Sequence, residues 1–179
     1  MENALHITFV WLHIFGIALF VGPQFFLAFA WLPASRGIED LPTRVKAMRT
    51  ITRRFGYLGG VGLVLIVIAG GYLIGTWRSF YSQPDDIGFN DLRFGVIFSI
   101  KMLLLLVMLV VTGLHMFVVG PKQLAKMEAV ASGENVSDAE VRKVRMQSMV
   151  LSMSGLALTL VIMVLGVMLT TTSFSFQQF

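Results

Sequence analysis

The chain contains no cysteine and only a small share of charged residues. Of its 179 residues, 13% are Asp, Glu, Lys or Arg, whereas an ordinary soluble domain has about 25%. The absence of cysteine excludes a disulfide framework, a thiolate metal site and an iron–sulfur cluster. The basic residues flank apolar runs and do not form a basic face, so we expect no nucleic-acid partner.

Apolar residues make up most of the chain. It is 56% hydrophobic with a mean hydropathy of +0.78, which excludes intrinsic disorder. A hydrocarbon core of about 30 Å needs about 20 helical residues to cross it. Four runs are long enough, at about 5–31, 55–77, 94–119 and 149–171. The sequence therefore predicts an all-α, polytopic membrane protein, with one membrane domain over residues 1–179 built as a four-transmembrane-helix bundle in the lipid bilayer.

Positive charge is concentrated in two of the three links between these runs. The links at 34–54 and 121–147 carry eleven Lys and Arg residues, and the link between the second and third runs carries two. Since cytoplasmic links are rich in Lys and Arg, we expect both basic links in the cytoplasm and both termini extracytoplasmic. The two basic residues of the middle link are Arg78 and Arg93, and its carboxylates are Asp85, Asp86 and Asp91.

Local patterns indicate how the first and fourth helices begin. The start of the chain, Met1-Glu2-Asn3, carries no positive charge, and the first run is about twice as long as the apolar region of a signal peptide. We therefore expect the first run to be retained as a helix. Ser137 with Glu140 three residues later is typical of a capping box, so the fourth helix is predicted to begin near Ser137, ahead of the membrane.

Lys101 and His13 are polar residues inside the apolar runs, where inserting a polar side chain into the bilayer costs free energy. Lys101 is the only charge inside the third run. A charged Lys at a helix centre costs roughly 2.5–3.5 kcal/mol to insert, so it normally faces a cavity, a partner or a cofactor; snorkelling to the outer interface is the alternative. Both residues lie about eight positions into inward-running helices, which places both about 12 Å below the outer edge. Equal depth is what a shared site requires.

Three further residues complete the cofactor-binding candidates. His6 precedes His13 by two turns, about 10.5 Å along the axis, so the two cannot be opposite ligands of one haem iron; a solvated or propionate-contacting role is expected for His6. His115 shares the face of Lys101 but lies fourteen residues deeper. The sequence lacks the matching histidines of a two-haem electron wire. The third candidate is Arg93, at the outer start of the third run.

Two stripes of residues at helical spacing have both a packing and a functional interpretation. Glycines four apart in the second run allow a helix or a flat ligand to come close, and we expect them to pack helices. Methionines at helical spacing in the fourth run suit copper(I), although methionine is also an ordinary apolar filler. The glycine pairs are Gly56/Gly60 and Gly71/Gly75, and the methionines are Met146, Met149 and Met153.

Three patches, in an order that covers nearly the whole chain, resemble a known family. The first is His13, six apolar or small residues, Phe20-Val21-Gly22 and then Pro33; the second is Arg53-Arg54-Phe55-Gly56-Tyr57 leading to Ala69-Gly70-Gly71; the third is Phe94-Gly95 with Lys101 six residues after the glycine. Together they resemble the bacterial copper-resistance D (CopD) family and its relative, the J-type protoporphyrinogen oxidase (HemJ).

The J-type oxidases are four-helix membrane proteins associated with haem b, and a helix-one His and a helix-three Lys are their hallmark polar residues. The resemblance therefore implies one haem b between the first and third helices, with His13 as an axial ligand and Lys101 as the second ligand or the partner of a haem propionate. It implies a redox role, either electron transfer with the quinone pool or porphyrinogen oxidation by an oxidoreductase of the protoporphyrinogen-oxidase type.

This sequence departs from the J-type oxidases at two places. It has Ala28-Phe29 where those proteins carry Pro-Arg, and Thr112 where they carry a helix-three His. The copper branch of the family implies the alternative of copper transport across the membrane. A third alternative is a non-catalytic accessory subunit of a larger membrane complex or a homo-oligomer, with the glycine faces and basic links as contacts.

The unequal distribution of basic residues generates a topology prediction. A reporter fused after Phe179 should read as extracytoplasmic, and one inserted near Gly133 as cytoplasmic, because the eleven basic residues hold their links inside. Paired alkaline phosphatase and green fluorescent protein fusions measure this. The opposite pattern would reverse the orientation and remove the equal depth of His13 and Lys101.

Overall fold

The computed structural model describes residues 2–81 and 87–178. Every element named in these ranges is a helix, and extended pairing within them is limited to an isolated bridge between Leu92 and Gln178. Asp85 and Asp86 of the middle link lie outside the described residues. Four helices are long and apolar enough to cross a membrane, and they span Glu2–Ser35, Leu41–Gly75, Arg93–Ala131 and Asp138–Thr170.

The predicted all-α class with four apolar helices is therefore confirmed, whereas the side of the membrane on which the termini lie stays a prediction.

The elements form two compact units: unit 1 comprises Met1–Thr76 and Gly120–Arg145, and unit 2 comprises Trp77–Val119 and Met146–Phe179. The elements are α1 (Glu2–Phe25), η1 (Phe26–Trp31), α2 (Leu32–Ser35), α3 (Leu41–Gly75), α4 (Trp77–Tyr81), η2 (Phe89–Asp91), α5 (Arg93–Leu114), η3 (His115–Val119), α6 (Gly120–Ala131), α7 (Asp138–Thr170) and α8 (Thr172–Ser175).

The helices extend well past the apolar runs at their basic ends. α3 begins at Leu41, fourteen residues before the run that starts at Phe55. Its 35 residues measure about 52 Å, against about 30 Å for a hydrocarbon core. α6 continues past Val119 to Ala131, and α7 begins at Asp138, directly after Ser137 as predicted. Much of the two long basic links is therefore helical.

Local hydrogen bonds and a glycine turn mark the ends of these helical extensions. The Asp40 carboxylate accepts a hydrogen bond of 3.0 Å from the Thr43 backbone N–H and caps α3. Hydrogen bonding from Thr43 lowers the pKa of Asp40 below its ordinary value, because it favours the ionised carboxylate. After α6, Gly133 has φ +82°, and Glu134 N–H bonds back to the Ala129 carbonyl at 2.9 Å. This is the turn in which glycine ends a helix without strain.

Two of the spans contain a π-helical segment just ahead of a proline. η1 ends two residues before Pro33, and η3 ends two residues before Pro121. Proline lacks an N–H, and its ring crowds the carbonyl four residues earlier. A wider turn relieves that crowding, and Leu32 N–H accordingly bonds to the carbonyl of Leu27, five residues back.

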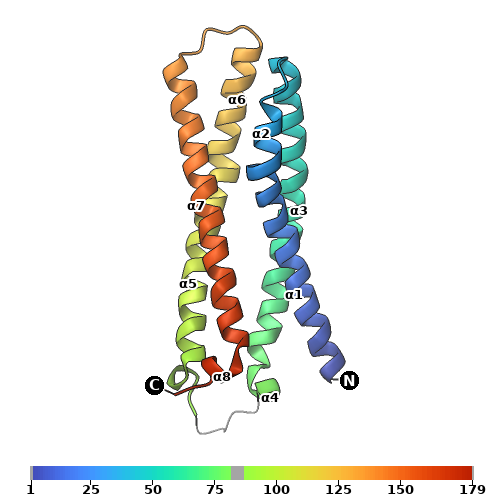
Figure 1. Ribbon diagram of the computed structural model, residues 1–179, viewed down its shortest axis with the longest axis vertical. Coiled ribbons are helices and arrows are strands. Elements are labelled where there is room, and N and C mark those ends of the chain that lie inside the picture. The colour runs from blue at the N-terminus through green and yellow to red at the C-terminus, as the bar shows by residue number, and fades with distance from the viewer. Residues whose placement is uncertain (1, 82–86, 179) are drawn as a thin grey trace. The chain divides into compact units, whose positions relative to one another are not determined.

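In unit 1, α1 lies beside α3 (Figure 1), and their backbones meet at two glycines. A Cβ added at Gly62 would lie 2.7 Å from the Gly16 carbonyl oxygen, and one added at Gly16 would lie 2.8 Å from the Gly62 oxygen. For Gly60, Gly71 and Gly75 the predicted packing role finds no support among residues 2–81 and 87–178, because a Cβ at each of these meets no described atom within 4 Å. Within α3, the glycine that packs backbone against backbone is Gly62, which faces α1.

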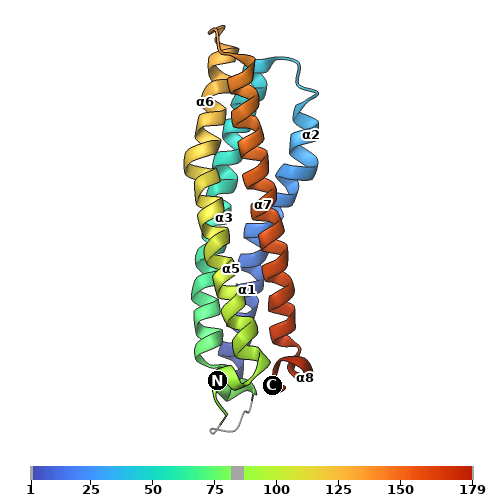
Figure 2. The ribbon, with the colours of Figure 1, turned by 90° about the vertical axis from the view of Figure 1, so that its left-hand side faces the viewer.

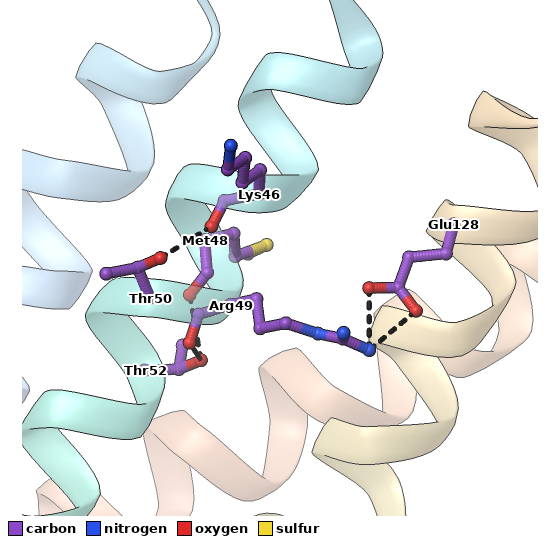
Figure 3. A network of polar contacts seen from close by, with 6 residues as sticks. All are labelled: Lys46, Met48, Arg49, Thr50, Thr52 and Glu128. Carbon is purple, nitrogen blue, oxygen red and sulfur yellow. Dashed lines mark hydrogen bonds and ion pairs between the residues drawn. The ribbon is translucent and has the colours of Figure 1, made fainter.

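α6 packs beside the basic end of α3 in the same unit (Figure 2). Arg49 of α3 reaches both carboxylate oxygens of Glu128 on α6, at 2.8 and 2.9 Å (Figure 3). Lys126 of α6 pairs with Glu140 of α7 at 2.6 Å. Exposed ion pairs of this kind contribute little stability each. They join α3 to α6 and α6 to the start of α7.

In unit 2, an aromatic cluster holds the chain end against the start of α5. Trp77 stacks on Phe94 with ring centroids 5.4 Å apart, and Phe94 stacks on Phe176 at 5.2 Å. Trp77 is 9% exposed within this cluster. Arg93 N–H donates to the Gln177 carbonyl at 3.1 Å. The cluster therefore defines where α5, which carries Lys101, begins.

The glycine contact generates a stability prediction. Gly62→Ala should lower the free energy of unfolding by about 1–3 kcal/mol, because an added methyl group overpacks two touching backbones. Gly60→Ala, two residues away on the same helix, meets no described atom within 4 Å and should leave stability unchanged or slightly higher. Thermal and denaturant unfolding in detergent measure both. Equal losses in the two variants would show that α1 and α3 are not packed through Gly62.

Candidate functional site

His13 is held by a hydrogen bond from α1 to α3 within unit 1. Its half-buried ring places Nδ1 3.1 Å from the backbone carbonyl oxygen of Ile66. A carbonyl oxygen only accepts hydrogen bonds, so Nδ1 is the donor in this contact. In the neutral tautomer that has this N–H, Nε2 carries the lone pair through which an imidazole coordinates a metal.

Gly70 makes room for the His13 ring. A Cβ at position 70 would lie 3.2 Å from His13 Cε1 and 3.5 Å from its Nδ1. In an α-helix the carbonyl oxygen of Ile66 also accepts a hydrogen bond from the backbone N–H of residue 70. The His13 ring bonds to the second lone pair of the same oxygen. Because residue 70 is glycine, no side chain stands in the way of the ring. A larger residue at 70 would push the ring away from Ile66.

Lys101 lies against a glycine in unit 2. Its half-buried side chain extends from α5 to α7, where Nζ is 3.7 Å from the position of a Cβ on Gly166. Gly166 lies four residues before the end of α7, about 6 Å along its axis. The amine thus reaches across to the neighbouring helix at a point where no side chain blocks it.

The two polar residues occupy equivalent places in two helical hairpins. His13 precedes Pro33 by twenty residues, and Lys101 precedes Pro121 by twenty. Each proline follows a π-helical segment. Each polar side chain meets a glycine on the next long helix, Gly70 for the first and Gly166 for the second. The sequence shows no strong internal repeat because the apolar residues between these landmarks differ.

The remaining candidates are spread along their helices. Lys101 follows Arg93 by eight residues and precedes His115 by fourteen, which are about 12 and 21 Å along a helix axis. These three residues therefore do not form one site in unit 2. The Arg93 guanidinium lies over the Phe174 ring, 5.2 Å from its centroid. His6 is half-buried two turns before His13 on α1.

His115 differs from His13 in its surroundings. It opens the π-helical segment η3, and its Nδ1 is buried with no hydrogen-bond partner among residues 2–81 and 87–178. Among the described residues, Nδ1 of His13 therefore has a hydrogen-bond acceptor, the Ile66 carbonyl, whereas Nδ1 of His115 has none.

A metal site with three or more protein ligands has no counterpart in the described residues. No three His, Asp or Glu side chains gather there to hold a metal ion, whereas haem iron takes only axial ligands from a protein. The methionines of the copper interpretation lie on the exposed surface of α7, with 53%, 51% and 43% of Met146, Met149 and Met153 accessible.

Comparisons of the chain with protein-family models, with curated proteins and with solved structures gave no match. The resemblance to the copper-resistance D and J-type oxidase families stays a prediction from the sequence. The residues that sequence reasoning missed are Ile66, whose backbone carbonyl is invisible in a pattern, and Gly166. Gly70 belongs to the glycines of the second run for which packing is expected, but nothing in the sequence indicates that it faces His13.

The Ile66 contact generates a prediction about the tautomer of His13. In iron-free protein labelled with ¹⁵N in its three imidazoles, the His13 ring should show a protonated Nδ1 and an unprotonated Nε2. The His13→Gln variant assigns the resonances. Gly70→Leu should abolish this signature and Gly71→Leu should keep it, because only position 70 touches the ring. A protonated Nε2 in the parent protein would contradict the contact.

Proposed function

We propose that the chain is a haem b-binding integral membrane protein with a redox role, in which His13 is an axial ligand. The observation that supports this is the hydrogen bond of 3.1 Å from His13 Nδ1 to the Ile66 carbonyl oxygen. Histidines that ligate metals almost always donate their other ring N–H to a carbonyl, a carboxylate or water, which holds the tautomer and the ring plane. α3 supplies this partner, and Gly70 clears the space for the ring.

Lys101 is the second residue of the proposal, as the other axial ligand or as the partner of a haem propionate. A neutral amine has a lone pair for iron, whereas a charged ammonium attracts a carboxylate. Support comes from the cost of a lysine inside an apolar helix and from the space that Gly166 leaves for the amine, whose Nζ lies 3.7 Å from where a Cβ on Gly166 would be. His6 at the start of α1 and Arg93 at the start of α5 are proposed contacts for propionates.

The reaction class follows from the cofactor. Haem b supplies one-electron iron chemistry when bound. In the proposal His13 presents an oriented nitrogen, and the apolar residues of the spans exclude water. Quinone or a porphyrinogen is the electron partner, which makes the chain an electron carrier or an oxidoreductase of the protoporphyrinogen-oxidase type in a bacterial inner membrane. Copper transport and an accessory role are the competing functions, although exposure of the α7 methionines does not favour a copper path through the chain.

A visible spectrum of the purified chain tests the proposal. We expect a Soret band that His13→Ala removes or greatly reduces and that His6→Ala largely keeps. The matched glycine pair adds a control, because Gly70→Leu should lose haem and Gly71→Leu should retain it. A parent protein without a Soret band would reject haem binding, and loss of haem in His6→Ala alone would identify the other histidine as the ligand.

The same spectra separate the roles of Lys101. If the amine ligates iron, Lys101→Met should keep haem with a changed axial field, since a thioether is a competent but different ligand, and Lys101→Leu should leave a five-coordinate iron that binds carbon monoxide. If Lys101 pairs with a propionate, Lys101→Arg should preserve the spectrum and Lys101→Leu should weaken binding without a change in coordination. Parent-like spectra in all three variants would remove Lys101 from the site.

A further inference from the structure

The charged residues at the basic ends of the spans are segregated by depth. The cations nearest to the apolar runs are Arg53 and Arg54 of α3, Lys122 of α6 and Arg145 of α7. Counted from the runs that begin or end at 55, 119 and 149, they lie one to four residues away, which is about 1.5–6 Å along a helix. We call these four residues the proximal cations.

The carboxylates lie farther out. The nearest on α6 and α7, Glu128 and Glu140, are each nine residues from an apolar run, about 13 Å along the helix. Both are engaged by distal cations, in the pairs Arg49–Glu128 and Lys126–Glu140 (Figure 3 shows the first). Within one helical turn of the proximal cations the sequence has no Asp or Glu, and no ion pair of theirs occurs in the described part of the chain.

The layer in which the proximal cations lie is that of the lipid headgroups. The headgroup region adds about 5–7 Å on each side of a hydrocarbon core of about 30 Å, and the four cations fall within it while the carboxylates fall beyond it. All four are exposed. The Arg53 guanidinium lies over the ring of Tyr57, 6.0 Å from its centroid, and is thus directed one turn toward the apolar run.

We propose that the proximal cations form a binding surface for the phosphates of anionic phospholipids. In unit 1, α3, α6 and α7 carry these cations at a similar depth, and no carboxylate lies at that depth. This arrangement of positive charge matches the negative charge of a layer of anionic headgroups. A cation close to such a surface increases binding about fivefold. An acidic protein would have to displace lipid to reach this layer, which favours lipid as the partner. Lys46 is exposed too, but it lies farther from the apolar run, beyond the headgroup layer.

The experiment measures lipid preference in the full-length chain. The protein is reconstituted in nanodiscs of equimolar phosphatidylglycerol and phosphatidylcholine, and the lipids that it retains after release are counted by native mass spectrometry. The parent should retain phosphatidylglycerol preferentially. Arg54→Gln and Lys122→Gln should each lower that preference by up to about fivefold, and Arg54→Lys should restore it.

Lys46→Gln is the matched control, because it removes one exposed positive charge from the same helix at about 13 Å from the apolar run. It should leave the lipid preference unchanged. Circular dichroism of each variant verifies the helical fold, and Arg54→Lys keeps the test valid if Arg54→Gln folds poorly.

Three results would overturn the proposal. A preference that persists in Arg54→Gln and Lys122→Gln would place lipid binding elsewhere. A parent protein with no preference for phosphatidylglycerol would leave an acidic protein surface as the partner of these cations. Displacement of phosphatidylglycerol by inorganic phosphate, at an ionic strength matched with sodium chloride, would identify a site for free anions. Haem content plays no part in any of these outcomes.

Discussion

The close approach of α1 and α3 at Gly16 and Gly62 is the contact on which the candidate site depends. At this point the backbone oxygen of each glycine lies within 2.8 Å of the position where the other glycine would carry a Cβ. His13 lies one turn before Gly16, and Ile66 lies one turn after Gly62, so the same approach brings the imidazole to 3.1 Å from the carbonyl. Hydrogen bonds weaken within a few tenths of an ångström of this length. Any side chain at Gly62 that separated the helices would therefore also release His13.

The membrane imposes the second constraint, through depth. Backbone polar groups have no water to bond with in the hydrocarbon, so the apolar runs must be helical throughout. In unit 1, α3, α6 and α7 continue past the apolar runs. The number of residues between a charged side chain and the apolar run therefore sets the distance of that charge from the hydrocarbon core. Cations next to the apolar runs and carboxylates about 13 Å out are two layers of one arrangement, in which the ion pairs Arg49–Glu128 and Lys126–Glu140 occupy the outer layer.

The two hairpins show how one scaffold can hold two different polar groups. In each, a π-helical segment and a proline follow the polar residue by a similar number of residues, and a glycine on the next helix gives the side chain room. His13 finds a hydrogen-bond acceptor in the Ile66 carbonyl, while Lys101 extends to Gly166. A polar side chain inside a span is tolerated when the neighbouring helix leaves space and a partner for it, and glycine provides the space in both hairpins.

The sequence by itself determined the helical class, the four apolar spans and the start of α7, because apolar length and local capping patterns act over short stretches of chain. It also singled out His13 and Lys101, since a polar residue in an apolar run is conspicuous. Only the tertiary structure decided which glycines pack, that Ile66 orients His13, and that the basic links continue as helices joined by ion pairs. These depend on which face of a helix meets its neighbour, and in runs that are apolar all round the pattern of residues does not specify that face. A backbone carbonyl, moreover, is the same at every position of a sequence, so its role becomes visible only when another helix approaches it.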